Sequence, residues 1–191
     1  FNSNLLKQTL LHIQENYAEQ FAEGNLLIMP IGRKGNDFFR KRGFLTISDF
    51  HEIQHNLTFT EAKKAAQFAM DAFTDKTVDR IDIIYNEFKN IATQIVRTEQ
   101  FLPIPEFSLD KEETSEKSDK SKDNDKKAIS HDYIFEPSVE YLLEEIIPQS
   151  LRIVFYKSLL ESNASEQGAR MTAMDKATEN AGELLKELNL M

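Results

Sequence analysis

The longest uninterrupted helical pattern in the chain covers residues 148–191. This stretch contains no proline after Pro148 and only two glycines, so a single helix of about 65 Å is expected at 1.5 Å per residue. Its apolar side chains recur at alternating steps of three and four residues, which is the spacing of a coiled-coil seam. We therefore expect a second helix to lie along this one. The predicted seam comprises Ile153, Leu160, Ala164, Met171, Met174, Thr178, Ala181, Leu185 and Leu188.

A second stripe on the same helix carries small side chains. Small side chains let another backbone approach closely but bury little apolar area, so this stripe is expected to be a surface for sliding or close contact. The alternative interpretation is a terminal helix packed on its own domain, with methionine and alanine as ordinary core residues. The stripe comprises Ser158, Ser162, Ser165, Ala169, Thr172 and Ala173.

The first half of the chain alternates helical and strand patterns. Apolar residues at steps of three and four predict a helix over residues 4–22. The unbroken apolar run at residues 26–31, bounded by glycines, predicts a buried parallel strand. A short helix over residues 36–42 and a small strand over residues 44–47 follow. Helix followed by strand indicates an α/β fold.

The next stretch predicts one helix and one hairpin. A helix over residues 60–73 has a narrow, alanine-rich packing face and is capped by Thr58 or Thr60. Residues 80–88 and 91–100 are strand-like, and the chain between them is short. They are expected to form an antiparallel hairpin at one edge of the sheet.

A polar, charged segment interrupts the pattern after the hairpin. Residues 110–127 contain seven acidic and six lysine residues and no aliphatic or aromatic side chain. A segment with nothing to bury cannot offset its ordering entropy, so we expect a disordered insertion at about residues 108–130. Residues 133–135 are a candidate last strand. Pro137 suits the first turn of a helix that runs through Ile147.

The composition narrows the functional classes. The net charge of −9 argues against a general binder of nucleic acid or anionic membranes, since neutralising phosphates requires clustered lysine and arginine. The absence of cysteine excludes disulfides and thiolate metal sites in this chain. No window approaches 18 consecutive apolar residues, so no membrane span is predicted. The one basic cluster, Arg33-Lys34 with Arg40-Lys41-Arg42, is either a solvated helix face or a contact for an acidic partner.

Two motifs suggest chemistry at first sight. Gly32-Arg33-Lys34-Gly35 resembles a phosphate loop, but no complete phosphate-binding motif occurs, and a strand-to-helix turn that needs glycine is the better account. The stretch HEIQH matches the zinc protease signature, with His51 and His55 as ligands and Glu52 as general base. It lies in a short stretch between a strand and a helix cap, and no third ligand is evident. No catalytic residue, metal ligand or cofactor site is predicted.

Three short stretches are distinctive. They are ESNASEQGARMTAM at residues 161–174 followed by ATENA at 177–181, PIGRKG at 30–35 followed by Phe38-Phe39 and Arg42-Gly43, and DIIYNEF at 82–88. The first resembles the run that opens the C-terminal helix of the gamma subunit of rotary F-type ATP synthases. The second resembles the early strand-to-helix turn of that family, and the third resembles its Y-N-x-F stretch.

The resemblance has implications for the fold. It implies an α/β, Rossmann-like three-layer domain over residues 1–147 and a long coiled-coil helix over residues 148–191 that is only part of the family's rotor helix. The chain opens at Phe1, where the family is already past its first strand, and stops at Met191, before the family's usual ending. We therefore expect a middle piece that lacks the N-terminal rotor helix, the first strand and the C-terminal tip. The missing helix would be the partner of the seam.

The resemblance also has implications for function. It implies the non-catalytic central shaft of a proton-translocating ATP synthase, which turns inside a ring of alpha and beta subunits and contacts the epsilon subunit and the membrane c-ring at its foot. Such a protein is peripheral, on the cytoplasmic face of the bacterial inner membrane, without membrane insertion, nucleic acid or cofactor. Two alternatives are an adaptor that recruits another coiled coil outside any synthase, and a zinc peptidase built on HEIQH.

Overall fold

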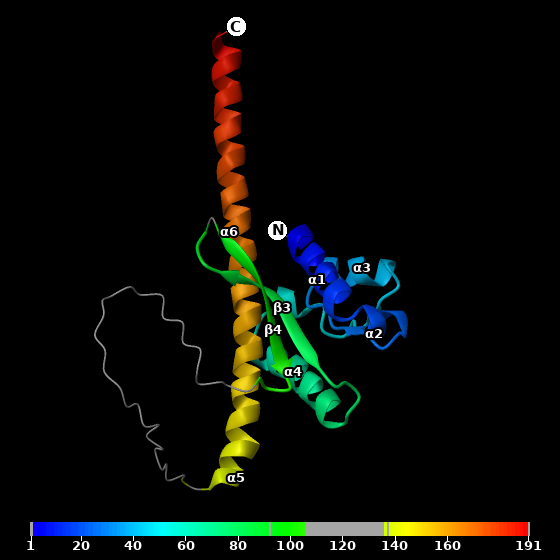
Figure 1. The fold of residues 1–191 in the computed structure, drawn as a ribbon. Coiled ribbons are helices and arrows are strands. Elements are labelled where there is room, and N and C mark those ends of the chain that lie inside the picture. The colour runs from blue at the N-terminus through cyan, green and yellow to red at the C-terminus, as the bar shows by residue number, and fades with distance from the viewer. Residues whose placement is uncertain (1, 92, 106–135, 137, 191) are drawn as a thin grey trace, which may run out of the picture.

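The computed structural model describes residues 2–91, 93–105, 136 and 138–190, and it mixes helices and sheets with one long C-terminal helix (Figure 1). The expected insertion at 108–130 and the candidate strand at 133–135 lie outside the described residues. The helices are α1 (Asn2–Asn16), α2 (Ala18–Ala22), α3 (Arg33–Lys41), α4 (Phe59–Thr74), α5 (Val139–Tyr141) and α6 (Ile147–Leu190), with a 3-10 turn at Ile53–His55 and a π-helical turn at Leu142–Ile146. The strands are β1 (Leu27–Ile28), β2 (Leu45–Thr46), β3 (Ile81–Phe88) and β4 (Gln94–Leu102).

The predicted first helix is interrupted at Tyr17. Its backbone has φ −135° and ψ 24°, which ends α1, and α2 then begins at Ala18. The Tyr17 hydroxyl donates a hydrogen bond to Asp82 of β3, 65 residues away. The spacing of apolar residues in the sequence runs through Tyr17 without interruption. It therefore gives no sign that the backbone leaves the helical conformation there. The prediction of a single helix over residues 4–22 is therefore wrong.

The four strands form two separate ladders among the described residues. Strand β1 pairs in parallel with β2, with Leu27 opposite Leu45. Strands β3 and β4 form the predicted antiparallel hairpin. The first pair is short and partly open to solvent, with Leu27 45% exposed, rather than a fully buried strand. The expectation of a hairpin at the edge of one shared sheet is not met, since β3 and β1 share no ladder here.

The core lies between α4, α6 and the hairpin. The Thr58 hydroxyl accepts a hydrogen bond from the backbone N–H of Glu61 and caps α4. Alanines on one face of α4 let this helix approach α6 closely. The core cluster comprises Ile53, Ala62, Ala65, Ala66, Ala69, Met70, Phe101, Leu102, Phe155 and Leu159. Phe155 and Leu159 come from α6, so the first half of the long helix belongs to this core. The division of the chain at residue 148 stays a prediction.

Strand β3 is covered on two sides by helices. Helix α6 packs against β3 and α4, and α1 also contacts β3. Figure 1 shows α6 running past the β3–β4 hairpin and then continuing upward with no other element beside it. The prediction of one uninterrupted helix in the C-terminal part is confirmed. None of the helices in the described ranges has an apolar stretch long enough to cross a lipid bilayer.

Candidate interaction surface on helix α6

Helix α6 consists of two segments with different surroundings. Its buried residues are Phe155, Ser158, Leu159, Ser165 and Gly168, all in the part that lies along β3 and α4. From residue 173 to residue 190 every residue is exposed except the half-buried Gly182. We call residues 151–172 the seated segment and residues 173–190 the free segment.

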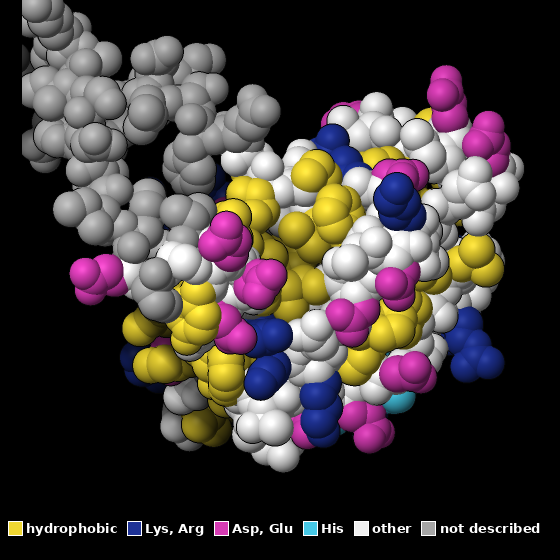
Figure 2. All heavy atoms as spheres, turned by 90° about the horizontal axis from the view of Figure 1, so that it is seen from below, with side chains coloured by type: hydrophobic (Ala, Val, Ile, Leu, Met, Phe, Trp, Pro, Cys, Tyr) yellow, Lys and Arg dark blue, Asp and Glu magenta, His cyan; other side chains and the backbone are white. Residues whose placement is uncertain are grey.

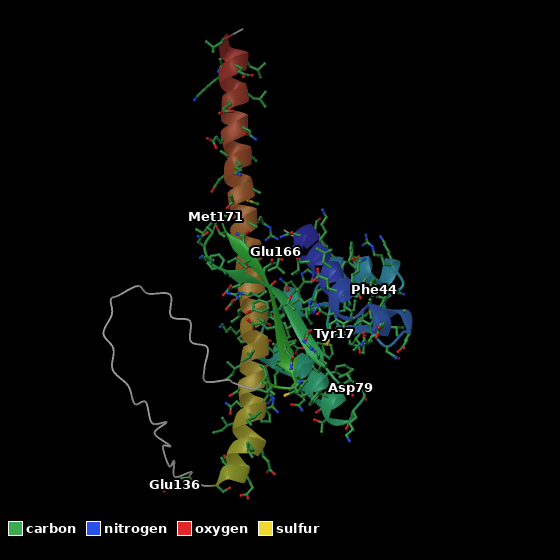
Figure 3. All side chains as sticks on the ribbon, viewed as in Figure 1. Tyr17, Phe44, Asp79, Glu136, Glu166 and Met171 are labelled. Atoms are coloured by element: carbon green, nitrogen blue, oxygen red, sulfur yellow. The ribbon has the colours of Figure 1, made fainter. Side chains whose placement is uncertain are left out.

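The candidate site consists of the predicted coiled-coil seam without Thr178. All eight of its residues are exposed. In the seated segment, Ile153 is 50% and Leu160 is 43% exposed, because the seam faces away from β3. In the free segment, the exposed fractions rise to 62% for Leu185 and 65% for Leu188. The remaining members are Ala164, Met171, Met174 and Ala181. Figure 3 shows Met171 near the level at which α6 leaves the hairpin. Met171 and Met174 are thus not ordinary core residues.

The stripe of small residues contacts the backbone of the same chain, whereas the sequence pattern predicts a surface for sliding or close contact. The backbone that approaches it belongs to strand β3 of the same chain and to the turn after that strand. Ser165 is fully buried, and its Oγ donates to the carbonyl oxygen of Asn86 at 3.1 Å. Thr172 Oγ1 shares its one proton between the carbonyl oxygen of Gly168 in the same helix, at 3.1 Å, and that of Ile91 in the turn after β3, at 3.3 Å. Close approach is confirmed, but these hydrogen bonds make the stripe a fixed contact rather than a sliding surface.

A glycine permits the closest part of this contact. A Cβ added to Gly168 would lie 3.3 Å from Cε2 of Phe88 and 3.5 Å from the carbonyl oxygen of Ile91. A separation of 3.3 Å is tighter than ordinary carbon–carbon contact, so an alanine here would push the ring or the helix away. The sequence presents Gly168 as a weak interruption of the helix, and only the fold shows that the hairpin needs the space.

Two residues of the basic cluster, Arg33 at the start of α3 and Arg42 just after its end, contact other side chains of this chain. Arg33 Nη2 lies 3.1 Å from Glu52 Oε1, and both side chains are more than half exposed. The Arg42 guanidinium lies over the ring of Phe38, 3.6 Å from its centroid. Gly32, which precedes the helix, has φ +126°, a backbone angle that favours glycine. The motif at residues 32–35 is therefore a strand-to-helix turn, as the sequence indicates.

The HEIQH stretch lacks the α-helix that the zinc protease signature requires. Only Ile53–His55 is helical, as a single 3-10 turn, so the two histidines are not presented together on one face of an α-helix. The ring of His51 contacts the carbonyl oxygen of Ser48, and Glu52 pairs with Arg33. Within the described ranges, no three His, Cys, Asp or Glu side chains are grouped to hold a metal ion.

One buried charged cluster is not evident in the sequence. Asp82 Oδ2 accepts hydrogen bonds from His12 Nε2 at 3.0 Å and from the Tyr17 hydroxyl at 2.6 Å, and Oδ1 accepts from Arg80 Nε at 3.0 Å. Burial works to raise the pKa of Asp82, but the three donors outweigh it and lower this pKa. Burial, followed by the hydrogen bond to Asp82, raises the pKa of Tyr17 to about 12. This cluster fastens α1 to β3.

A cavity of about 340 Å³ lies between the two ladders. Consecutive residues line it on both sides, namely residues 26–31 around β1 and residues 80–85 of β3. Leu5 and Ile13 of α1 and Phe155 of α6 also line it. Among the described strands, β1 pairs only with β2 and β3 only with β4, so neither strand has a ladder partner towards this cavity. The cavity is a mainly apolar slot bordered by two strands, and the cluster of His12, Tyr17, Arg80 and Asp82 also lines it.

Comparison with known proteins assigns the family. The sequence model described as ATP synthase matches residues 1–191, the whole chain. The chain belongs to the ATP synthase family. The family resemblance carried by residues 30–35, 82–88 and 161–181 is therefore confirmed.

Several curated members of this family align with the full chain. An ATP synthase gamma chain of Cytophaga hutchinsonii is 46% identical over 190 residues, which cover all of this chain and 60% of that protein. Those of Chloroherpeton thalassium and Chlorobaculum parvum are each 40% identical and are covered over 61% and 60% of their lengths. The chain thus spans about 60% of the length of these relatives.

Proposed function

We propose that this chain is part of the non-catalytic central rotor shaft, the gamma subunit, of a proton-translocating ATP synthase. The observation that supports this most directly is the free segment of α6. It projects beyond the rest of the described structure (Figure 3) and exposes the seam residues Met174, Leu185 and Leu188. The names of the relatives support the same assignment.

The free segment has no buried residue of its own. Most helical stability in proteins comes from the packing of an apolar face, so a partner along the seam would stabilise this segment. Apolar side chains at alternating steps of three and four are covered when a second helix lies along the seam. We assign that place to an N-terminal helix of the intact subunit, which belongs to the length of the relatives that this chain does not span.

The shaft would act by mechanical coupling. Alpha and beta subunits would surround the free segment, and the shaft would present a different face to each catalytic site as it turns. A contact that differs between two conformations of a site shifts the equilibrium between them. The chain itself would contribute neither a catalytic residue nor a cofactor.

The foot of the molecule is the proposed contact for the epsilon subunit and the c-ring. Figure 2 shows this lower face, on which hydrophobic side chains gather with acidic and basic side chains around them. Tyr141 of α5 and Leu143 and Ile146 of the π-helical turn that leads into α6 are each about half exposed, at 51%, 54% and 49%. These contacts would hold the subunit as a peripheral protein at the cytoplasmic face of the bacterial inner membrane.

The Rossmann-like three-layer arrangement is part of the same proposal. The slot between β1 and β3 is lined mainly by apolar side chains, and each bordering strand has an edge that no described strand occupies. A strand inserted there would join the two ladders into one sheet, with α1 on one face and α4 and α6 on the other. We propose that the intact subunit supplies this strand, that residues 1–147 then form the α/β domain and that residues 148–191 form part of the rotor helix.

The two alternatives have less support. An adaptor outside any synthase could use the same exposed seam, but the family match gives no support to that role. A zinc peptidase would need His51 and His55 on one helical face, and these residues lie in a turn and a 3-10 helix.

Assembly tests the rotor proposal. The full-length subunit is mixed with alpha and beta subunits, and complex formation is measured together with ATP hydrolysis. We expect assembly with wild-type protein and weaker assembly after Leu185→Glu, which places a charge in the seam. Glu179→Gln, in the same free segment but outside the seam, is the matched control and should assemble normally. Absence of any complex with the wild-type subunit would contradict the proposal.

A further inference from the structure

Backbone hydrogen bonds join two described residues of the turn between β3 and β4, close to where this turn meets α6. Asn90 and Thr93 exchange two backbone hydrogen bonds of 3.2 Å each. The carbonyl oxygen of Ile91 accepts from Gln94 Nε2 at 2.9 Å as well as from Thr172 Oγ1 at 3.3 Å. Because the turn is held by its own hydrogen bonds, it contacts α6 at one place along the helix axis. This contact therefore sets the position of the hairpin along α6.

Gly168 restricts α6 to one register along the hairpin. The Phe88 ring and the Ile91 backbone occupy the space that a Cβ at this position would need. Sliding the helix by one turn would bring a residue with a Cβ into the same space. The only other glycine in α6 is Gly182, which is 14 residues further along the sequence, or about 21 Å along the helix. No nearby register offers the same fit.

A second contact prevents α6 from rolling about its own axis. Arg152 donates to Gln67 Oε1 of α4 through Nη2 at 2.7 Å and through Nε at 3.2 Å. Ser165 bonds the β3 backbone at Asn86. At 100° per residue, positions 152 and 165 lie about 140° apart around the helix. Two different elements therefore hold α6 from two sides.

We propose that Ser165, Gly168 and Thr172 are positioning residues that lock the seated segment of α6 to the β3–β4 hairpin and transmit torque between the free segment and the α/β part. This inference rests on the proposed rotor function. A force applied to the free segment reaches the rest of the described chain through the seated segment, because the free segment has no buried residue of its own. Without these contacts, α6 would rotate about its own axis relative to the hairpin and α4, and the torque would not reach the α/β part.

A cross-link tests the lock directly. The printed chain contains no cysteine, so Gly168→Cys with Ile91→Cys introduces one defined pair. An added Cβ at Gly168 would lie 3.6 Å from Cα of Ile91, so the two introduced side chains start from neighbouring backbone positions. In the assembled complex with the full-length subunit, the reduced pair should pump fewer protons per ATP than wild type, because the new Cβ at position 168 disturbs the contact with the hairpin. Oxidation should restore pumping, because the disulfide joins the two elements again. Equal pumping by the reduced pair and wild type, or a further loss on oxidation, would overturn the lock.

A pair of glycine substitutions tests the same contact by disrupting it. Gly168→Leu should leave ATP hydrolysis in the complex but lower proton pumping per ATP several-fold. Gly182→Leu is the matched control, because nothing lies within 4 Å of its added Cβ, and it should pump like wild type. The milder Gly168→Ala should lower pumping less, and Phe88→Ala should restore it.

The outcomes separate the lock from the rotor proposal itself. Equal pumping by Gly168→Leu and Gly182→Leu would overturn the lock while the rotor function stands. Should Gly168→Leu fail to assemble, the cross-linked pair still decides the question. A wild-type subunit that does not assemble would contradict the rotor function, and the lock with it.

Discussion

Asp82 holds helix α1 on strand β3 through a single carboxylate. Its side chain is 8% exposed and accepts hydrogen bonds from His12, Tyr17 and Arg80. The sequence gives little sign of this cluster, because His12 of α1 and Tyr17, just after α1, lie 70 and 65 residues away from Asp82. Only an acidic residue within the apolar run of β3 hints at a buried role. Pairings over such distances depend on the fold and cannot be obtained from local pattern.

Asp82→Asn should destabilise the protein at neutral pH. Hydrogen bonds to a charged group contribute more than neutral ones, so we expect a loss of about 1–3 kcal/mol in the free energy of unfolding. The pKa of Asp82 is lowered in the folded state, and its unfolded value is about 3.9. The contribution is thus complete above about pH 4 and is lost as the pH falls through the folded pKa.

Urea unfolding at several pH values measures this effect. The difference between wild type and Asp82→Asn should shrink as the pH falls below about 4. Tyr17→Phe removes one donor and keeps the carboxylate, so it should cost about 1 kcal/mol at neutral pH. A difference between wild type and Asp82→Asn that stays constant down to pH 3 would show that the charge is not the source of the stability.

At the level of elements, local signals in the sequence identify most helices and the hairpin. Helix α4, the β3–β4 hairpin and α6 follow from apolar spacing, capping residues and turn residues. The break at Tyr17 does not, because a tertiary hydrogen bond accompanies it. The face of α6 that meets β3 is also hidden in the sequence, since serine, glycine and threonine give no apolar signal, and only their contacts with the β3 backbone show that they are packed.

The N-cap of α4 provides a test at this scale. The sequence allows either Thr58 or Thr60 as the cap, and the structure places the hydrogen bond on Thr58. Thr58→Ala should lower the free energy of unfolding by about 1 kcal/mol. Thr60→Ala is the matched control and should change it by less than about 0.5 kcal/mol, as expected for a surface position. Thermal unfolding of both variants measures the difference, and equal effects would contradict the assignment of the cap.

At the scale of the whole molecule, the sheet is incomplete among the described residues. The sequence predicts the individual strands, but it does not predict that β1 and β3 border an open slot, because strand order is a property of the fold. The proposed strand from the intact subunit would bury the apolar lining of this slot. Burial of that lining would make unfolding of the full-length subunit expose more surface.

Denaturant unfolding of the two chain lengths tests this expectation. The full-length subunit should show a larger dependence of the unfolding free energy on urea than residues 1–191, because that slope scales with the surface exposed. Its midpoint should also lie at higher urea. Unfolding of both chain lengths is followed by the same spectroscopic signal, one that reports on the core around Phe155. A slope and midpoint that do not change with length would mean that the slot stays open.

Because burial changes abruptly along α6, the rate of amide hydrogen exchange should also change abruptly along this helix. Amide protons of the seated segment should exchange only when the core opens, while those from residue 173 to residue 190 should exchange with local fraying. Both sets belong to one continuous helix, so the difference between them reports surroundings and not secondary structure. When a partner binds, the residue at which slow exchange ends marks how far along the helix that partner reaches.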